Sequence, residues 1–338
     1  MSIAQAWRER VDANPDRIAI RYFDGSLTAA EVDAHAQALA VDLRERGVRH
    51  GDRIGIHLQN VPHYPIVLLA LWHLGAVGVP LNPMYQGAEL RRLVDDSGAT
   101  GIVAAPGEEA LREALAGSTV RWIITASAND FQTRRAVAEP SPSPDGDVAA
   151  ILAARAGERT TPATVGPDET AFITYTSGTT GPPKGALNTH RNFLHAVANY
   201  AEWVALEPGD VSFAIAPLFH ITGLSLNAGI ALLNDATLSL AGRFEPEAVL
   251  EAFREHGVTT TIGSITAFNA LLRVPTAGAE HLRTIRLLYS GGAPIPPATI
   301  ESFRSRFGHY LHNIWGMTET TGGGVAVPAG AAAPVHEP

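Results

Sequence analysis

The chain has 338 residues, of which 46% are hydrophobic and 17% charged, with 32 glycines, 23 prolines and no cysteine. This length allows one large or two ordinary globular domains, and the lack of cysteine excludes disulfides, thiolate metal sites and cysteine nucleophiles. A formal net charge of −9 argues against nucleic-acid binding, which needs clustered basic residues.

The N-terminal segment and the apolar runs predict neither export nor membrane insertion. Residues 1–11 mix charged with apolar residues and lack the apolar core of a secretory signal. The longest apolar run, 65–80, is shorter than the ~20 residues that span a bilayer. We therefore expect a cytoplasmic protein without a transmembrane segment.

Helix-like and strand-like segments alternate over the first 125 residues. Thr28 and Glu31 have the spacing of a capping box, which predicts a helix over 28–46. Apolar runs typical of buried strands lie at 53–58, 76–79, 101–104 and 121–125, with helix-length segments at 62–74, 87–96 and 108–116. This alternation predicts an α/β fold with crossover connections and mainly parallel sheets.

Residues 127–168 differ in character, because Pro-Ser-Pro-Ser-Pro-Asp-Gly at 140–146 interrupts a stretch of polar and small residues. They predict a connection between two sub-regions, 1–126 and 169–338. In the second sub-region we expect strands at 171–175, 211–215, 236–240, 258–262, 285–289 and 310–314, and helices at 189–203, 221–233, 246–256, 265–272 and 297–307. Residues 322–338 show neither a helical nor a strand period.

The glycine-rich segment 174–185, Thr-Tyr-Thr-Ser-Gly-Thr-Thr-Gly-Pro-Pro-Lys-Gly, carries the strongest chemical signal. Its small residues leave backbone N–H groups and hydroxyls free to bind phosphate oxygens. Lys184 is the only lysine beside 24 arginines and adds a compact positive charge. The two prolines before Lys184 exclude a Walker A loop. The predicted phosphate-binding residues are Thr176, Ser177, Gly178, Thr179, Thr180, Gly181 and Lys184.

This segment resembles the phosphate-loop signature of the adenylate-forming (AMP-binding) superfamily, which includes acyl-CoA synthetases, peptide-synthetase adenylation domains and beetle luciferases. Further segments resemble blocks of that family in the same order, at 27–56, 74–84, 217–223, 290–294 and 315–319. The resemblance implies that residues 1–338 form the layered parallel-sheet subdomains of the family's N-terminal AMP-binding domain, incomplete at the C-terminal end. The family's small C-terminal domain, with its second lysine, has no counterpart in these residues, so we expect the chain to be inactive or very slow in the full reaction.

The resemblance also implies roles for individual residues. Thr318 would contact the α-phosphate, Glu319 would hold Mg²⁺, and His220 would contact the acyl group and act as a gate; these three are the implied catalytic residues. The residues implied to bind adenine or AMP are Gly291, Gly292, Ala293, Pro294, Asn313, Ile314, Trp315, Gly316, Met317 and Thr318. The residues implied to form the acyl pocket and its gate are His220, Thr222, Gly223, Ser264 and Phe268.

By this resemblance, the intact enzyme would join a carboxylic acid to AMP from ATP, with Mg²⁺, and pass the acyl group to coenzyme A. The block at 217–223 contains no aspartate to pair with an ammonium group, which favours a fatty or other apolar acid over an amino acid. Two alternatives stay open at this point: an adenylation domain that loads a carrier protein, and a non-catalytic nucleotide-binding module. A homodimer is also compatible with the sequence.

Overall fold

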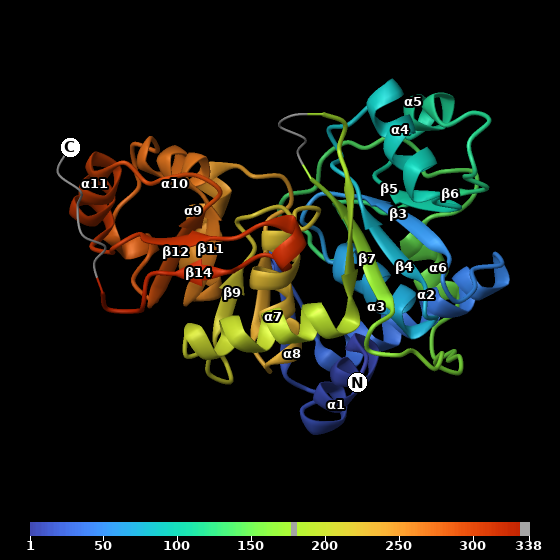
Figure 1. Ribbon diagram of the computed structural model, residues 1–338, viewed down its shortest axis with the longest axis horizontal. Coiled ribbons are helices and arrows are strands. Elements are labelled where there is room, and N and C mark those ends of the chain that lie inside the picture. The colour runs from blue at the N-terminus through green and yellow to red at the C-terminus, as the bar shows by residue number, and fades with distance from the viewer. Residues whose placement is uncertain (177–180, 332–338) are drawn as a thin grey trace.

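A computed structural model describes residues 1–176 and 181–331, which form two α/β halves side by side (Figure 1). Four residues of the predicted phosphate loop, Ser177, Gly178, Thr179 and Thr180, lie outside the described residues. Within the described residues, no helix combines the length and the apolar character needed to cross a bilayer.

The helices and strands have the following bounds. The α-helices are α1 (Ile3–Ala13), α2 (Ala29–Glu45), α3 (His63–His73), α4 (Gly87–Ser97), α5 (Glu109–Ala114), α6 (Val148–Ala154), α7 (His190–Trp203), α8 (Ile230–Leu233), α9 (Pro246–His256), α10 (Ile265–Leu272) and α11 (Pro297–Phe307). The remaining helices are the π-helix η1 (Thr222–Gly229) and the 3₁₀-helices η2 (Ala279–His281) and η3 (Thr318–Thr320). The strands are β1 (Ile18–Tyr22), β2 (Gly25–Thr28), β3 (Arg53–His57), β4 (Val77–Pro80), β5 (Gly101–Ala104), β6 (Ile123–Thr125), β7 (Thr170–Tyr175), β8 (Gly185–Thr189), β9 (Val211–Phe213), β10 (Thr237–Leu240), β11 (Thr260–Ser264), β12 (Leu287–Gly291), β13 (His312–Trp315) and β14 (Val325–Ala326).

These elements match the predicted alternation closely. β5, α10 and α11 have the predicted bounds, and α2 begins at Ala29, directly after Thr28, the N-cap residue of the predicted capping box. In that box the backbone N–H of Glu31 donates to Thr28 Oγ1 at 3.2 Å, and the backbone N–H of Thr28 donates to Glu31 Oε2 at 2.7 Å. The α/β fold with mainly parallel sheets is therefore confirmed.

The strands form two sheets. The first has the order β6-β5-β3-β4-β7-β8 and is parallel except for β8, which runs antiparallel to β7. The second has the order β14-β13-β12-β11-β9-β10-β1-β2 and is parallel from β13 to β1, with antiparallel strands at both edges. Because the parallel strands of a sheet end at one edge, the loops that leave there can share a ligand.

Neither sheet follows the division that residues 127–168 predicted. β1 precedes this segment but pairs with β10 in the second sheet, with Ile20 opposite Leu238. β7 follows it but joins the first sheet beside β4. The segment itself contains α6, in which Val148 is fully buried. The sub-regions 1–126 and 169–338 are thus interleaved, because strand pairing depends on contacts between residues distant in the sequence.

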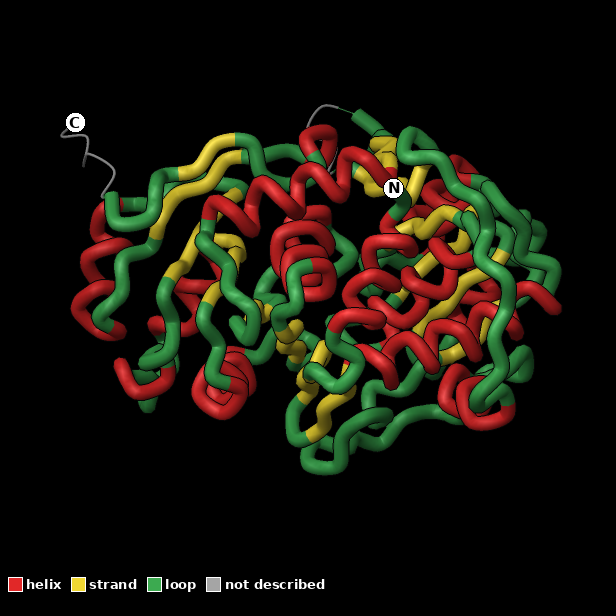
Figure 2. The backbone as a smooth tube through the Cα atoms, turned by 90° about the horizontal axis from the view of Figure 1, so that it is seen from below, coloured by secondary structure: helices red, strands yellow, loops and turns green. Residues whose placement is uncertain are grey.

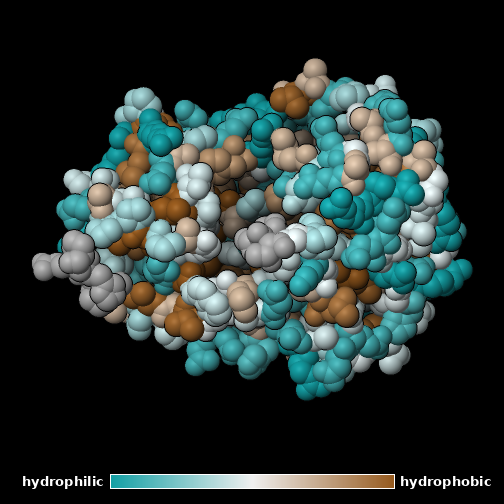
Figure 3. Space-filling view, turned by 45° about the horizontal axis from the view of Figure 1, so that its top comes forward, coloured by the Kyte–Doolittle hydropathy of each residue, from teal (hydrophilic) through white to brown (hydrophobic). Residues whose placement is uncertain are grey.

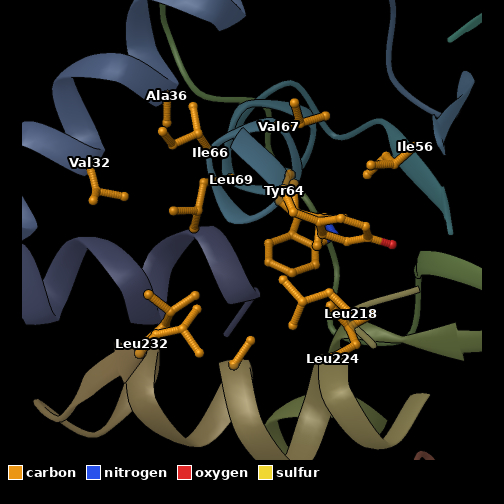
Figure 4. Close-up of a cluster of buried hydrophobic side chains, with 14 of the residues drawn as sticks. Val32, Ala36, Ile56, Tyr64, Ile66, Val67, Leu69, Leu218, Leu224 and Leu232 are labelled. Carbon is orange, nitrogen blue, oxygen red and sulfur yellow. The ribbon is translucent and has the colours of Figure 1, made fainter. Parts of the chain in front are cut away.

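A layer of helices joins the two halves through the main hydrophobic core (Figure 2). Every residue of α3 is buried, and Figure 4 shows Leu224 and Leu232 on the side of the cluster opposite Leu69 of α3. Burying one leucine side chain contributes roughly 1.5–3 kcal/mol. This shared core holds the two halves, and so the carboxyl edges of the two sheets, in fixed positions.

The predicted helix at 221–233 has a different form, because residues 222–229 form the π-helix η1. Ser225 Oγ lies 2.6 Å from the carbonyl oxygen of Ile221, the group that an α-helical N–H at residue 225 would use. Gly223 lies so close to the preceding loop that a Cβ there would be 2.1 Å from the carbonyl oxygen of Pro217. π-Helical turns occur frequently at functional sites, and this one begins two residues after His220.

Candidate functional site

The β7–β8 hairpin carries the predicted phosphate loop. The backbone N–H of Thr176 donates to the Lys184 carbonyl at 3.0 Å, and the backbone N–H of Lys184 donates to Thr176 Oγ1 at 3.3 Å. The Lys184 side chain is exposed and forms no ion pair with another described residue. Its ammonium group is therefore available to an anionic ligand.

Tyr175 anchors the base of this hairpin to the helices of the first sheet. Its hydroxyl donates to Asp96 Oδ2 at 2.6 Å, and it also lies 3.2 Å from the Leu93 carbonyl oxygen. Burial and then the Asp96 carboxylate raise the pKa of the Tyr175 phenol, so it stays protonated and remains a donor at neutral pH. The strand that leads into the phosphate loop is thus fixed at its end.

The carboxyl ends of β11, β12 and β13 lie side by side in the second sheet. Ser264 pairs with Gly291 across β11 and β12, and Ser290 pairs with Asn313 across β12 and β13. A Cβ at Gly291 would lie 3.0 Å from the Ile314 carbonyl oxygen, so a larger residue would push these strands apart. The turn 291–294, implied by the sequence to bind adenine, leaves from this edge, and Gly292, Ala293 and Pro294 are exposed there.

Trp315 ends β13, and 55% of its surface is exposed. The chain folds back sharply after it, because a Cβ at Gly316 would lie only 1.5 Å from the Gly322 carbonyl oxygen. A Cβ at Gly324 would lie 3.1 Å from the Trp315 ring, so this glycine packs directly against the indole. The ring is therefore held at the carboxyl edge of the sheet with much of its surface open.

Glu319 lies in η3, where its carboxylate is a candidate ligand for Mg²⁺. The Glu319 carboxylate is exposed and forms no ion pair within residues 1–176 and 181–331. No cluster of three or more histidine, aspartate or glutamate side chains among the described residues could hold a metal by itself. Mg²⁺ is usually bound through one or two carboxylates together with phosphate oxygens and water. A single open carboxylate fits a Mg²⁺ ion that arrives with a nucleotide.

A buried hydrogen-bond network joins this turn to the hairpin. The Thr174 hydroxyl donates to Asn188 Oδ1 at 2.6 Å, and Asn188 Nδ2 donates to Thr321 Oγ1 at 3.1 Å and to the Thr318 carbonyl at 3.3 Å. From η1, Ser225 Oγ lies 2.8 Å from the Thr321 carbonyl oxygen. Sequence reasoning missed Asn188, Ser225 and Thr321. The one available signal for Asn188 was a polar side chain in a strand beside the phosphate loop.

His220 lies just before η1 with a defined proton position. The backbone N–H of Thr222 donates to its Nδ1 at 3.3 Å, and a neutral ring that accepts at Nδ1 carries its proton on Nε2. Desolvation by the surrounding protein lowers the pKa of His220, although part of the side chain is exposed. At neutral pH the ring therefore offers an N–H donor rather than a positive charge.

A cavity of about 450 Å³ opens between α7, η3 and β14. Its apolar lining includes Tyr200, Trp203, Leu226, Ile314 and Val325, and its polar lining includes Asn192, His195, Asn199, Glu319 and Thr320. Separately from this cavity, Figure 3 shows the molecular surface hollowed between the two halves, with hydrophobic side chains inside the hollow. The cavity thus brings apolar surface next to the proposed metal-binding carboxylate.

This cavity differs from the acyl pocket that the sequence implied, because none of His220, Thr222, Gly223, Ser264 and Phe268 is among the described residues that line it. Phe268 is fully buried in the core of the second sheet, where its ring centroid lies 5.7 Å from that of Phe303. Ser264 caps α10 by accepting the Ala267 N–H at 3.3 Å. The apolar pattern of α10 therefore reflects core packing.

The chain belongs to the AMP-binding enzyme family, whose model matches residues 7–337. The chain is 32% identical to feruloyl-CoA synthase of Amycolatopsis sp over 314 residues. This alignment covers 93% of the chain and 59% of that protein. It is 28% identical to long-chain-fatty-acid–CoA ligase of Yersinia pestis over 316 residues, and that alignment covers 87% of the chain and 56% of the ligase. The chain thus spans less than two thirds of the length of these relatives.

Solved structures show the same fold. Apo MatB from Rhodopseudomonas palustris matches with a TM-score of 0.83 and 25% identity, over 98% of this chain and 63% of that one. A benzoate CoA ligase from Burkholderia xenovorans LB400 matches with a TM-score of 0.84 and 24% identity, over 98% of this chain and 64% of the ligase chain. These matches confirm the layered α/β architecture that the sequence resemblance implied.

Proposed function

We propose that this chain is the nucleotide- and acid-binding part of an acid–CoA ligase. Such an enzyme activates a carboxylic acid as acyl-AMP and then transfers the acyl group to coenzyme A. The observation that carries the proposal is the junction of two elements, the hairpin that bears Lys184 and the turn that bears Glu319, through Asn188. Relatives named as CoA synthases and CoA ligases support the same chemistry.

In this proposal each site residue has a distinct role. The Lys184 ammonium binds the outer phosphates of ATP, and Thr318 contacts the α-phosphate. Glu319 holds Mg²⁺, which when bound neutralises charge on the phosphate oxygens. The open Trp315 ring stacks on adenine, beside the turn 291–294. His220 is not among the described residues that line the cavity beside Glu319, and we assign it the role of a gate next to the acid.

Two bond exchanges complete the proposed reaction. A carboxylate oxygen attacks the α-phosphorus of ATP, and the bond from that phosphorus to the bridging oxygen breaks, so pyrophosphate leaves with the electron pair. The thiolate of coenzyme A then attacks the acyl carbon, and the carbon–oxygen bond to AMP breaks. The protein contributes by orienting the reactants and by placing donors and positive charge where negative charge develops.

We assign the acid to the cavity beside Glu319 and expect it to be apolar. Leu226, Ile314 and Val325 supply apolar surface there. Among the described residues that line this cavity, the one carboxylate is Glu319, which is proposed to hold Mg²⁺, so no carboxylate is left to pair with an ammonium group. Burying an unpaired charge costs several kcal/mol. Both fatty acids and aryl acids meet this requirement, whereas α-amino acids do not.

ATP–pyrophosphate exchange tests the proposal. It is measured on the enzyme extended through the family's C-terminal domain, with Mg²⁺, ATP and a panel of aryl propenoic acids, fatty acids of several lengths and α-amino acids. We expect exchange that depends on an apolar acid and is lost in Lys184→Ala. Highest exchange with an α-amino acid would contradict the assignment, and thioester formation with a carrier protein instead of coenzyme A would change the acceptor. The cytoplasmic location and the homodimer stay predictions.

A further inference from the structure

Asn188 lies at the centre of a buried chain of polar groups, all of which come from different segments. Thr174, Asn188 and Thr321 are each 2% exposed, and Ser225 is fully buried. Thr174 and Asn188 belong to the two strands of the hairpin, Thr321 follows η3, and Ser225 belongs to η1. Each of these side chains has a hydrogen-bond partner in another segment, and such a buried network makes one arrangement of the segments more stable than others.

The partners of Asn188 explain why an amide is needed there. The Thr318 carbonyl can only accept a hydrogen bond, so the group that faces it at 3.3 Å must be the NH₂ of the amide. The amide oxygen then faces the Thr174 hydroxyl, which donates to it at 2.6 Å. Leucine could make neither bond, and aspartate would direct an anionic oxygen at the Thr318 carbonyl.

The hydrogen bond from Asn188 to Thr321 holds the turn in an unfavourable backbone conformation. Its φ is +59°, in the left-handed region, where a β-branched residue is strained by about 1–3 kcal/mol. Its hydroxyl oxygen accepts the Asn188 amide, and its carbonyl oxygen lies beside Ser225 Oγ. Contacts on both sides therefore keep Thr321 in place, two residues after Glu319.

We propose that Asn188 is a positioning residue that couples the phosphate-loop hairpin to the turn carrying Thr318 and Glu319. Through this coupling, Lys184 and Glu319 approach the same triphosphate with a fixed separation. The inference rests on the proposed function, because it concerns how the ATP site is assembled. It goes further by assigning that assembly to a residue that contacts neither the nucleotide nor the metal.

The test measures how much Mg²⁺ strengthens ATP binding, which is the ratio of the dissociation constants in EDTA and in Mg²⁺. Titration calorimetry compares wild type, Asn188→Leu, Glu319→Gln and the double variant. We expect Asn188→Leu to reduce this ratio about tenfold and the double variant to resemble Glu319→Gln alone, since both changes remove the same interaction. An unchanged ratio, or fully additive losses, would overturn the proposal.

Matched variants separate positioning from general stability. Gln37→Leu also removes a buried amide, one that lies 3.3 Å from His73 Nδ1 in the first half, and we expect it to leave the ratio unchanged. Thr321→Gly relieves the backbone strain but removes the hydroxyl, and we expect it to reduce the Mg²⁺ ratio as much as Asn188→Leu does. This variant provides the same test if Asn188→Leu folds poorly. Thr321→Ser keeps the hydroxyl and should restore the wild-type ratio.

Hydrogen exchange without nucleotide distinguishes this inference from the proposed function. Asn188→Leu should speed amide exchange in 317–322 and in 184–186 together, whereas Gln37→Leu should not. Unchanged exchange in these segments would overturn the coupling. A wild-type protein that binds no ATP but shows coupled exchange would instead contradict the proposed function and retain the structural coupling.

Discussion

The backbone N–H of Ile3 donates to Nδ1 of His190 at 3.2 Å and so joins α1 to α7, the helix that follows the phosphate-loop hairpin. The His190 ring is buried, with its centroid 6.5 Å from the Trp72 ring. Burial lowers the pKa of His190 from 6.5 to about 4. Because a protonated ring has no acceptor at Nδ1, this contact requires the neutral form.

The first prediction is that stability falls in acid because of His190. Between about pH 6.5 and 4 the unfolded chain binds a proton at this ring that the folded chain does not, so the free energy of unfolding decreases as the pH falls. From this ring alone we expect a loss of roughly 2 kcal/mol between pH 7.5 and pH 5. Urea unfolding at both pH values should show a loss smaller by that amount in His190→Asn. His195→Asn changes an exposed histidine on the same helix and is the control. If His190→Asn lost as much stability between the two pH values as the wild type, the prediction would be refuted.

Lys184→Ala should weaken ATP binding more than AMP binding, because AMP lacks the outer phosphates that the ammonium group is proposed to meet. Losing a hydrogen bond between charged groups costs about 1.5–3 kcal/mol, or roughly ten- to a hundredfold in the dissociation constant for ATP. Calorimetric titration with both nucleotides measures the difference. Arg191→Ala removes an exposed cation that is paired with Asp168 and should change neither affinity. Equal losses for ATP and AMP in Lys184→Ala would remove Lys184 from the phosphate site.

Glu319→Gln should preserve the fold and reduce the Mg²⁺ dependence of ATP binding. The amide keeps the shape of the side chain but lacks the anionic oxygen that Mg²⁺ prefers. Because Glu319 is exposed and unpaired among the described residues, we expect the melting temperature to change little. Titration of Mg²⁺ at fixed ATP gives the readout. A wild-type Mg²⁺ response in this variant would show that the carboxylate does not bind the metal.

Trp315→Ala should weaken ATP and AMP binding to the same extent, since both ligands contain adenine. Loss of ring stacking at this half-exposed indole should cost about 1 kcal/mol, or roughly fivefold in affinity. Trp315→Tyr retains an aromatic ring and should restore most of the binding. Trp203→Phe is the control variant. Trp203 is also partly exposed, and its indole N–H donates a hydrogen bond to the Tyr289 hydroxyl at 3.0 Å. A loss confined to ATP would place Trp315 away from adenine.

Val325→Trp should obstruct the acid cavity without disturbing the nucleotide. Val325 lines this cavity, yet 69% of its surface is exposed, so the larger side chain can be accommodated without repacking the core. We expect at least a severalfold rise in the acid concentration that gives half-maximal pyrophosphate exchange, with unchanged ATP affinity. Val137→Trp, a change at a similarly exposed valine outside the cavity, is the control. Unaltered acid dependence would show that the acid binds elsewhere.

Much of the fold and part of the site could be predicted from the sequence, because the signals are local. Thr28 and Glu31 form the capping box that their spacing indicated. The bounds of α10 and α11 follow from apolar periodicity within a few turns. Lys184 and Glu319 were selected by short blocks, and the structure leaves both side chains exposed, Lys184 in the β7–β8 loop and Glu319 in η3 after β13.

The relations between distant segments could not be predicted in this way. Asn188 and Thr321 are 133 residues apart, and neither residue carries a local pattern that indicates their contact. The family resemblance implied that Phe268 belongs to the acyl pocket, but packing against Phe303 places it in the core. Likewise, β1 joins the sheet of the second half through β10.

Periodicity and capping depend on neighbouring residues, so the sequence by itself determined the elements and the candidate phosphate-binding residues. Only tertiary packing, in which buried polar groups must find partners across the chain, decided that the hairpin bearing Lys184 is hydrogen-bonded to the turn bearing Glu319.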